Sequence, residues 1–205
     1  MEDIVEAVTS LYKQGDWKTI VNSYRSHPQR NKVLWVFPTE ENFEFIANCM
    51  AELKCETILS IGCGSGLLEW MITAATGYHV SGIEVDGAWW QCKYSPPTFI
   101  PLRFTGQKLD ETIITVLGNS NQIALLFCYF NNGPAFKEYI DNFGGKALII
   151  IGPGDGKGVH TDPRPFGDVP EEWILHDSQE VESSKDYIAV YYRHYSYTNN
   201  YFRQN

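Results

Sequence analysis

Apolar residues change their spacing along the chain near residue 56, from a helical repeat to short continuous runs. In residues 3–12 and 17–24 they recur every three or four positions, which predicts two helices separated at Gly15. A third helix is predicted to start at Thr39, directly after Pro38. Its apolar face would consist of Phe43, Ile46, Ala47, Met50 and Leu53.

Beyond residue 56, short apolar runs alternate with segments of helical spacing. The runs, predicted as strands, cover residues 57–61, 78–85, 99–104, 122–130 and 146–151. The helical segments cover residues 67–76, 87–94, 109–117 and 134–143. Strands that are apolar on both faces are typical of a parallel sheet between two layers of helices. Pro101 interrupts the third strand, so we expect that strand near an edge of the sheet.

The last two predicted strands, residues 173–181 and 187–195, alternate around a polar turn and form an antiparallel hairpin. A long loop rich in Gly and Pro, residues 152–170, precedes them, and loops of this length are usually functional or disordered. The expected fold class is α/β, with a three-layer, mostly parallel sheet and a C-terminal antiparallel hairpin. We expect a helical N-terminal cap at 1–53, one sheet domain at 54–195, and a frayed tail at 196–205.

Composition bears mainly on partners and compartment. The net charge of −9 and the lack of a basic run disfavour nucleic acid, although an acidic domain can carry one local basic groove. Five scattered cysteines, none in C-x-x-C, indicate free thiols in a reducing compartment and no zinc site. The polar N-terminus excludes a secretory signal, and no apolar run reaches the roughly 18–20 residues of a membrane span. A cytoplasmic or nuclear protein without a membrane partner is expected.

Three glycines, Gly62, Gly64 and Gly66, lie between the first strand of the sheet and the helix that follows it. Glycine at such a turn lets a ligand approach the backbone closely, because a Cβ would block it. The helix after the turn directs its first amide groups towards the ligand. A tight turn without any ligand is the alternative.

Glu84, at the tip of the next strand, is the second feature of this unit. A carboxylate there can accept hydrogen bonds from both ribose hydroxyls of a nucleoside. Asp86 follows closely, and it fits the N-cap of the next helix. The loop and Glu84 together favour a nucleoside ligand.

The stretches ILSIGCGSG and HVSGIEVD resemble the first two motifs of the class I (seven-stranded, Rossmann-like) S-adenosylmethionine-dependent methyltransferases. The likeness covers about residues 54–195, but its specific motifs occupy only 59–86. It implies a Rossmann-like fold and S-adenosylmethionine as cofactor. A nicotinamide oxidoreductase is a further hypothesis. Dinucleotide dehydrogenases prefer G-x-G-x-x-G, so the G-x-G-x-G spacing here disfavours it.

The resemblance also implies which residues would bind the cofactor. The expected set is Ser60, Gly62, Cys63, Gly64, Gly66, Glu84 and Thr105. Ser60 stands where the family usually has an acid, and a hydroxyl cannot pair with the cofactor's ammonium as a carboxylate would. Thr105 or Gln107 could bond the amino group of adenine.

In this family the transferred methyl group lies near the end of the fourth strand, which here leads into Tyr129 and Asn131. Tyr129 could pack on the sulfonium and Asn131 could orient a nucleophile, although a turn with a helix-capping Asn explains the segment equally well. His160, in the long loop, could act as a general base or be a solvated surface residue. Cys128 lacks the preceding proline of a nucleophilic cysteine and is expected in the core.

The function implied by the resemblance is transfer of the cofactor's methyl group to a protein or small-molecule nucleophile. The alternative is a catalytically degenerate methyltransferase-like domain that acts as a partner-binding or sensing module. Ser60 and the unspecific segment after the fourth strand favour this alternative, whereas the intact glycines and Glu84 favour ligand binding.

Overall fold

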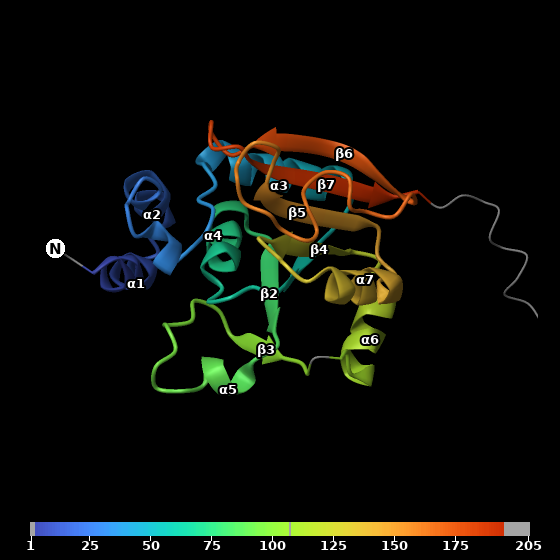
Figure 1. Cartoon of the computed structure of the whole chain (residues 1–205), viewed down its shortest axis with the longest axis horizontal. Coiled ribbons are helices and arrows are strands. Elements are labelled where there is room, and N and C mark those ends of the chain that lie inside the picture. The colour runs from blue at the N-terminus through green and yellow to red at the C-terminus, as the bar shows by residue number, and fades with distance from the viewer. Residues whose placement is uncertain (1–2, 107, 195–205) are drawn as a thin grey trace, which may run out of the picture.

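One seven-stranded sheet forms the centre of the chain in a computed structural model, which describes residues 3–106 and 108–194 (Figure 1). The strand order is β3-β2-β1-β4-β5-β7-β6, with β7 antiparallel to both of its neighbours and the other pairs parallel. The strands are β1 (Thr57–Ile61), β2 (His79–Glu84), β3 (Leu102–Phe104), β4 (Ile123–Cys128), β5 (Ala147–Pro153), β6 (Trp173–Glu180) and β7 (Asp186–Arg193). The predicted hairpin and the edge position of the third strand are confirmed.

Helices cover both faces of the sheet, with α1 and α2 at one side of the molecule and α6 and α7 at the other (Figure 1). They are α1 (Ile4–Gln14), α2 (Trp17–Tyr24), the short 3-10 helix η1 (Arg30–Lys32), α3 (Glu40–Glu52), α4 (Leu67–Thr76), α5 (Gly87–Trp90), α6 (Glu111–Gly118) and α7 (Gly133–Asn142). The α/β fold class with three layers is therefore confirmed.

Alternation along β1 and β4 divides the core into two buried clusters. Ile58 and Leu126 pack in the cluster that contains side chains of α1, α2, α3 and α4. Leu59 and Phe127 pack in the cluster that contains side chains of α6 and α7. Because side chains alternate across a strand, Ser60 lies on the same face of β1 as Ile58, towards α4.

The N-terminal helices share the first of these clusters with the sheet, through residues such as Ile4 and Phe43. The division of the chain at residue 53 stays a prediction. The expected tail at 196–205 and Gln107 lie outside the described residues.

Helix ends follow the capping signals in the sequence. The Thr39 side chain accepts a hydrogen bond from the backbone N–H of Asn42, whose own side chain accepts one from the Thr39 N–H, so α3 begins with a capping box. Gly77 ends α4 in the left-handed conformation. The Asp86 carboxylate accepts a hydrogen bond from the Trp89 N–H (2.9 Å), which confirms Asp86 as the N-cap of α5.

Two predicted elements are shorter than expected. The helix predicted at 87–94 ends at Trp90, where Ser95 Oγ donates to the carbonyl oxygens of Trp90 and Cys92 and turns the chain. The strand predicted at 99–104 begins only at Leu102, because the Phe99 N–H donates to the Ser65 carbonyl instead of to a neighbouring strand (2.8 Å). In the described part of the chain no helix has both the length and the apolar character needed to cross a membrane.

Candidate functional site

The glycine loop lies at the carboxyl end of β1, between β1 and α4. The chain crosses from β1 to β2 on one side, whereas β4 lies on the other side of β1. Strand order therefore reverses between β1 and β4. In open α/β sheets this reversal point is where ligands bind.

All three loop glycines have positive φ angles, but for different reasons. A Cβ at Gly62 would come within 2.8 Å of the Phe130 ring, and one at Gly66 would overlap Ile100. These two positions are thus fixed by packing against distant segments of the protein itself. At Gly64 (φ +60°) a Cβ would meet nothing within 4 Å, so only there does the backbone face open space.

Glu84 holds the glycine loop from the end of β2. Its Oε1 accepts a hydrogen bond from the Gly64 N–H (2.6 Å) and its Oε2 accepts one from the Val85 N–H (3.2 Å). It lines a cavity of about 580 Å³ at the carboxyl ends of β2, β3 and β4, here called the larger cavity. Gly106, Phe130 and Asn131 belong to the same lining. A nucleoside-sized space therefore lies beside the predicted ribose acid.

Glu69, in the first turn of α4, lies beside Ser60 in the interior. Ser60 Oγ donates a hydrogen bond to Glu69 Oε1 (2.6 Å), and Glu69 is 1% exposed. Its Oε2 is buried and has no hydrogen-bond partner among the described residues. Burial raises the pKa of this carboxyl from 4.5 to about 7.

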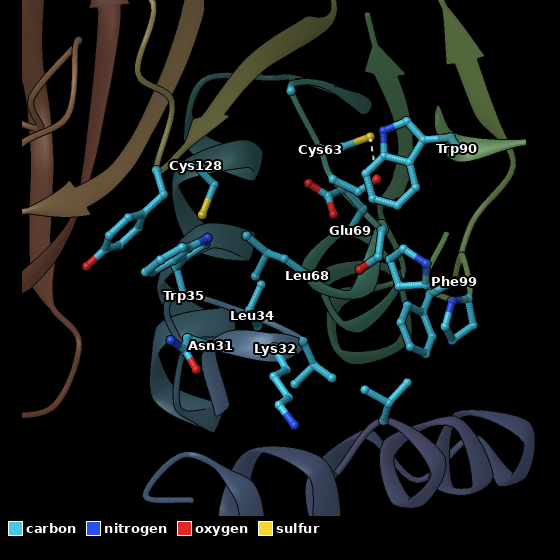
Figure 2. Close-up of a pocket in the computed structure, with 18 residues that line it drawn as sticks. Asn31, Lys32, Leu34, Trp35, Cys63, Leu68, Glu69, Trp90, Phe99 and Cys128 are labelled. Atoms are coloured by element: carbon cyan, nitrogen blue, oxygen red, sulfur yellow. Dashed lines mark hydrogen bonds between the residues drawn. The ribbon is translucent and has the colours of Figure 1, made fainter. Parts of the chain in front are cut away.

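The Glu69 carboxyl lines a second cavity, of about 260 Å³, here called the inner cavity. Figure 2 shows Glu69 and Cys63 on one side of this cavity and Trp35 and Cys128 on the other. Gly62 lines both cavities, so the loop separates the Glu69 carboxyl from the Glu84 carboxyl. Burial, followed by the charges of these two glutamates, raises the pKa of the Cys63 thiol well above its usual range.

Much of the remaining wall of the inner cavity is aromatic or apolar. Trp35 stacks on Tyr129 with ring centroids 6.0 Å apart and planes 14° from parallel. Trp90 lines the cavity as well, whereas Trp89 is largely exposed and Phe37 is buried in the core. Cys128 also lines this cavity, so it lies at the edge of the core.

Thr105 is buried next to β2 rather than lining either cavity. Its N–H donates to the Glu84 carbonyl oxygen (2.9 Å), and its hydroxyl lies 3.5 Å from the carbonyl oxygen of Lys108. The neighbouring Gly106 does line the larger cavity. A role for Thr105 at adenine stays a prediction.

The three residues predicted for catalysis lie in different places. Tyr129 lines the inner cavity and Asn131 lines the larger one, while the exposed His160 lines neither. Asn132, not Asn131, caps α7 by accepting a hydrogen bond from the Ala135 N–H (3.1 Å). Neither of these two cavities is lined by all three predicted residues, and their roles stay predictions.

Tyr129 belongs to a buried polar cluster that spans three segments. Its hydroxyl donates to Asp186 Oδ1 (2.6 Å), and Asp186 Oδ2 accepts from Lys157 Nζ (2.9 Å) and Ser184 Oγ (3.2 Å). Desolvation and then the Asp186 carboxylate raise the pKa of Tyr129 above its usual range. Asp186 is not recognisable from the sequence, because nothing local distinguishes it from the other polar residues of the turn before β7.

Glu69 is also not identifiable from the sequence. An acid in the first turn of a helix is ordinarily an exposed residue that complements the helix dipole. One sequence pattern points to it. Ser60 stands where the resembled family usually has an acid, and an acid, Glu69, instead follows three residues after the last loop glycine.

Among solved structures the chain is similar in fold to MtNAS crystallised in complex with MTA and tNA, with 11% identity, coverage of 93% of this chain and 70% of that one, and a TM-score of 0.54. It is also similar to magnesium protoporphyrin IX methyltransferase (ChlM) from Synechocystis PCC 6803 with bound SAH, with 12% identity, coverage of 94% and 100%, and a TM-score of 0.48. No protein-family model and no curated protein sequence matches the chain. The likeness to MtNAS, together with the seven-stranded sheet, confirms the predicted Rossmann-like fold.

Proposed function

We propose that the chain binds S-adenosylmethionine across the glycine loop and is a methyltransferase that uses it. The observation that carries this proposal is the pair of carboxyl groups on the two sides of the loop. Glu69 offers an unpartnered oxygen to the inner cavity, and Glu84 lines the larger cavity. A buried carboxylate with one oxygen unpartnered favours a cationic group, and S-adenosylmethionine carries both an ammonium and a sulfonium.

In this assignment each part of the cofactor has its own binding residues. Glu84 would hold the ribose hydroxyls, with the adenine in the larger cavity. Glu69, held by Ser60, would pair with the ammonium and so supply the carboxylate that Ser60 itself lacks. From the sequence alone, the lack of an acid at position 60 favours a degenerate domain. With Glu69 in that role, this argument is weaker.

The bound cofactor supplies a methyl group on a positively charged sulfur. The chain's contribution is to position the acceptor and to exclude water, and such transfer needs little more when the nucleophile is neutral or anionic. Trp35 and Tyr129 form an aromatic wall of the inner cavity. Favoured acceptors are a small molecule or a protein.

Calorimetric titration of the purified chain with S-adenosylmethionine and with NAD tests cofactor binding. We expect one site for S-adenosylmethionine and none for NAD. Glu69→Gln and Glu84→Ala should each weaken binding by about tenfold or more, because each removes a charge-assisted hydrogen bond. Glu44→Gln, on the exposed side of α3, is the matched control. Absence of binding at millimolar S-adenosylmethionine would refute the proposal.

Transfer of label from methyl-labelled S-adenosylmethionine to a cell extract then separates an enzyme from a binding module. A methyltransferase should label an acceptor, and Glu84→Ala should lower the labelling about tenfold when S-adenosylmethionine is below its Kd. Cofactor binding without any transfer would instead support the alternative, a partner-binding or sensing domain.

A further inference from the structure

A third cavity, of about 380 Å³, adjoins the inner cavity, and we call it the outer cavity. Asn31, Trp35 and Tyr129 line both, so the stacked rings of Trp35 and Tyr129 belong to the shared wall. Figure 2 shows Trp35 and Asn31 on the side of the inner cavity away from Trp90. The rest of the outer cavity comes from the connector after α2 and from the loop after β5.

The lining of the outer cavity is basic, although the chain as a whole carries a net charge of −9. Among the described residues it contains Arg30, His27 and Lys157 and no aspartate or glutamate. The connector, residues 25–32, includes Arg25, Arg30 and Lys32 and no acidic residue. A lining with basic and without acidic side chains favours a ligand of the opposite charge, so this cavity favours an anion.

The positive charges of this region differ in how far they are already neutralised. Lys157 is paired with the buried Asp186, and Arg25 is paired with Glu182 (2.8 Å). Arg30 donates from Nη1 to the carbonyl oxygen of Arg25 (2.8 Å). Its Nε and Nη2 have no hydrogen-bond partner in the described part of the chain, so its guanidinium keeps donors for a carboxylate or a phosphate.

The size and the walls of the cavity limit what the anion can be. A volume of about 380 Å³ suits a small organic molecule. Trp35 is 59% exposed and presents a flat aromatic surface, next to the apolar Val159 and Pro28. One unpaired guanidinium falls short of the several phosphate contacts with which nucleic acids are bound.

We propose that the methyl acceptor is a small anionic molecule whose carboxylate or phosphate is bound by Arg30 in the outer cavity and whose remainder packs on Trp35 and Tyr129. This inference rests on the proposed function, because it assigns the acceptor of the same site. Asn31, Trp35 and Tyr129 then lie where the outer cavity and the inner cavity meet.

Saturation-transfer NMR titration tests the inference. It measures the binding of benzoate, phenyl phosphate and the neutral benzamide to the full chain. The two anions should bind about tenfold more tightly than benzamide, as one charge-assisted hydrogen bond contributes about that factor. In Arg30→Gln the preference should fall to about threefold or less. Val159→Glu should lower it as well, by adding a negative charge at an exposed position of the wall that folding does not depend on. Lys137→Gln, which changes an exposed side chain of α7, should leave the preference unchanged.

Equal binding of benzamide and the anions by the wild-type chain overturns the inference, as does a charge preference that survives in both variants. An oligothymidylate that binds more tightly than phenyl phosphate, and that needs Arg30, overturns it in favour of a nucleic-acid acceptor. Titration of the same samples with S-adenosylmethionine keeps the two proposals distinguishable. Cofactor binding without anion preference removes the acceptor inference alone, whereas anion preference without cofactor binding removes the proposed function and the acceptor role with it.

Discussion

The buried carboxyl group of Glu69 should make the stability of the chain depend on pH. Its pKa is about 7 in the folded chain against an ordinary value of 4.5, because burial penalises the charged form. Between these pH values the folded chain holds a proton that the unfolded chain has released. The free energy of unfolding therefore falls as pH rises from about 4.5 to about 7, and it stays lower above that range.

Urea unfolding of the wild type and Glu69→Gln measures this effect. The shift corresponds to a loss of about 2.5 kcal/mol between pH 5 and pH 8. The variant cannot ionise at this position, so it should not show this loss. Glu44→Gln, at an exposed position, should keep the wild-type pH dependence. Parallel pH profiles for the wild type and Glu69→Gln would contradict the assignment of the carboxyl to the interior.

At the residue scale the sequence predicts where glycine is required in the loop, but not why it is required there. Gly62 and Gly66 are glycines because of Phe130 and Ile100, which lie far away in the sequence, so a purely local reading assigns them to the ligand instead. Only Gly64 faces open space as the sequence argument requires. Glu69 escapes prediction because its burial depends on how α4 folds back onto β1.

The polar cluster at the ends of three elements should matter more for stability than the surface ion pairs. Tyr129 follows β4, Lys157 follows β5 and Asp186 begins β7. Asp186→Asn leaves Lys157, which is 19% exposed, without its charged partner and should cost about 3 kcal/mol. Tyr129→Phe removes one hydrogen bond to a carboxylate and should cost about 1–2 kcal/mol.

Denaturant unfolding at neutral pH ranks these variants. Lys137→Met, which breaks an exposed pair with Asp141 on α7, should leave the free energy of unfolding unchanged within error. A cost for Asp186→Asn no larger than that of Lys137→Met would show that the cluster does not join the three elements.

Whole elements are predictable here where their signals are local. Thr39 and Asn42 predict the start of α3, because a capping box involves only neighbouring residues. The same Asn42 also donates to the Gln179 side chain (2.7 Å) and to the Glu180 carbonyl oxygen, and nothing in the sequence indicates this link to β6. The predicted lengths of α5 and β3 were wrong because they too depend on contacts that periodicity does not encode. Ser95 and Ser65 make these contacts and redirect the chain.

At the scale of the whole molecule, alternation of strands and helices predicts the sheet, and the strand order then places the glycine loop at its reversal point. The cavities themselves are not predictable, because each is built from segments far apart in the chain. The inner cavity takes Val5 from α1, residues 31–35 from the end of the connector and the segment after it, and Cys128 and Tyr129 from the end of β4. The connector has no motif, and only folding brings its basic residues to the site.

A ligand that fills both cavities should therefore protect segments that are remote in sequence. With S-adenosylmethionine in excess, hydrogen–deuterium exchange should slow in residues 62–65 and 84–85, and also in residues 31–35. Binding to the folded chain alone should raise its free energy of unfolding by about 2.7 kcal/mol at a ligand concentration of 100 Kd. Peptides from β6, at the far edge of the sheet, should exchange unchanged and are the internal control. Protection confined to residues 84–85, without slowing in residues 63–65 and 31–35, would restrict the cofactor to the larger cavity and would remove Glu69 from its binding site.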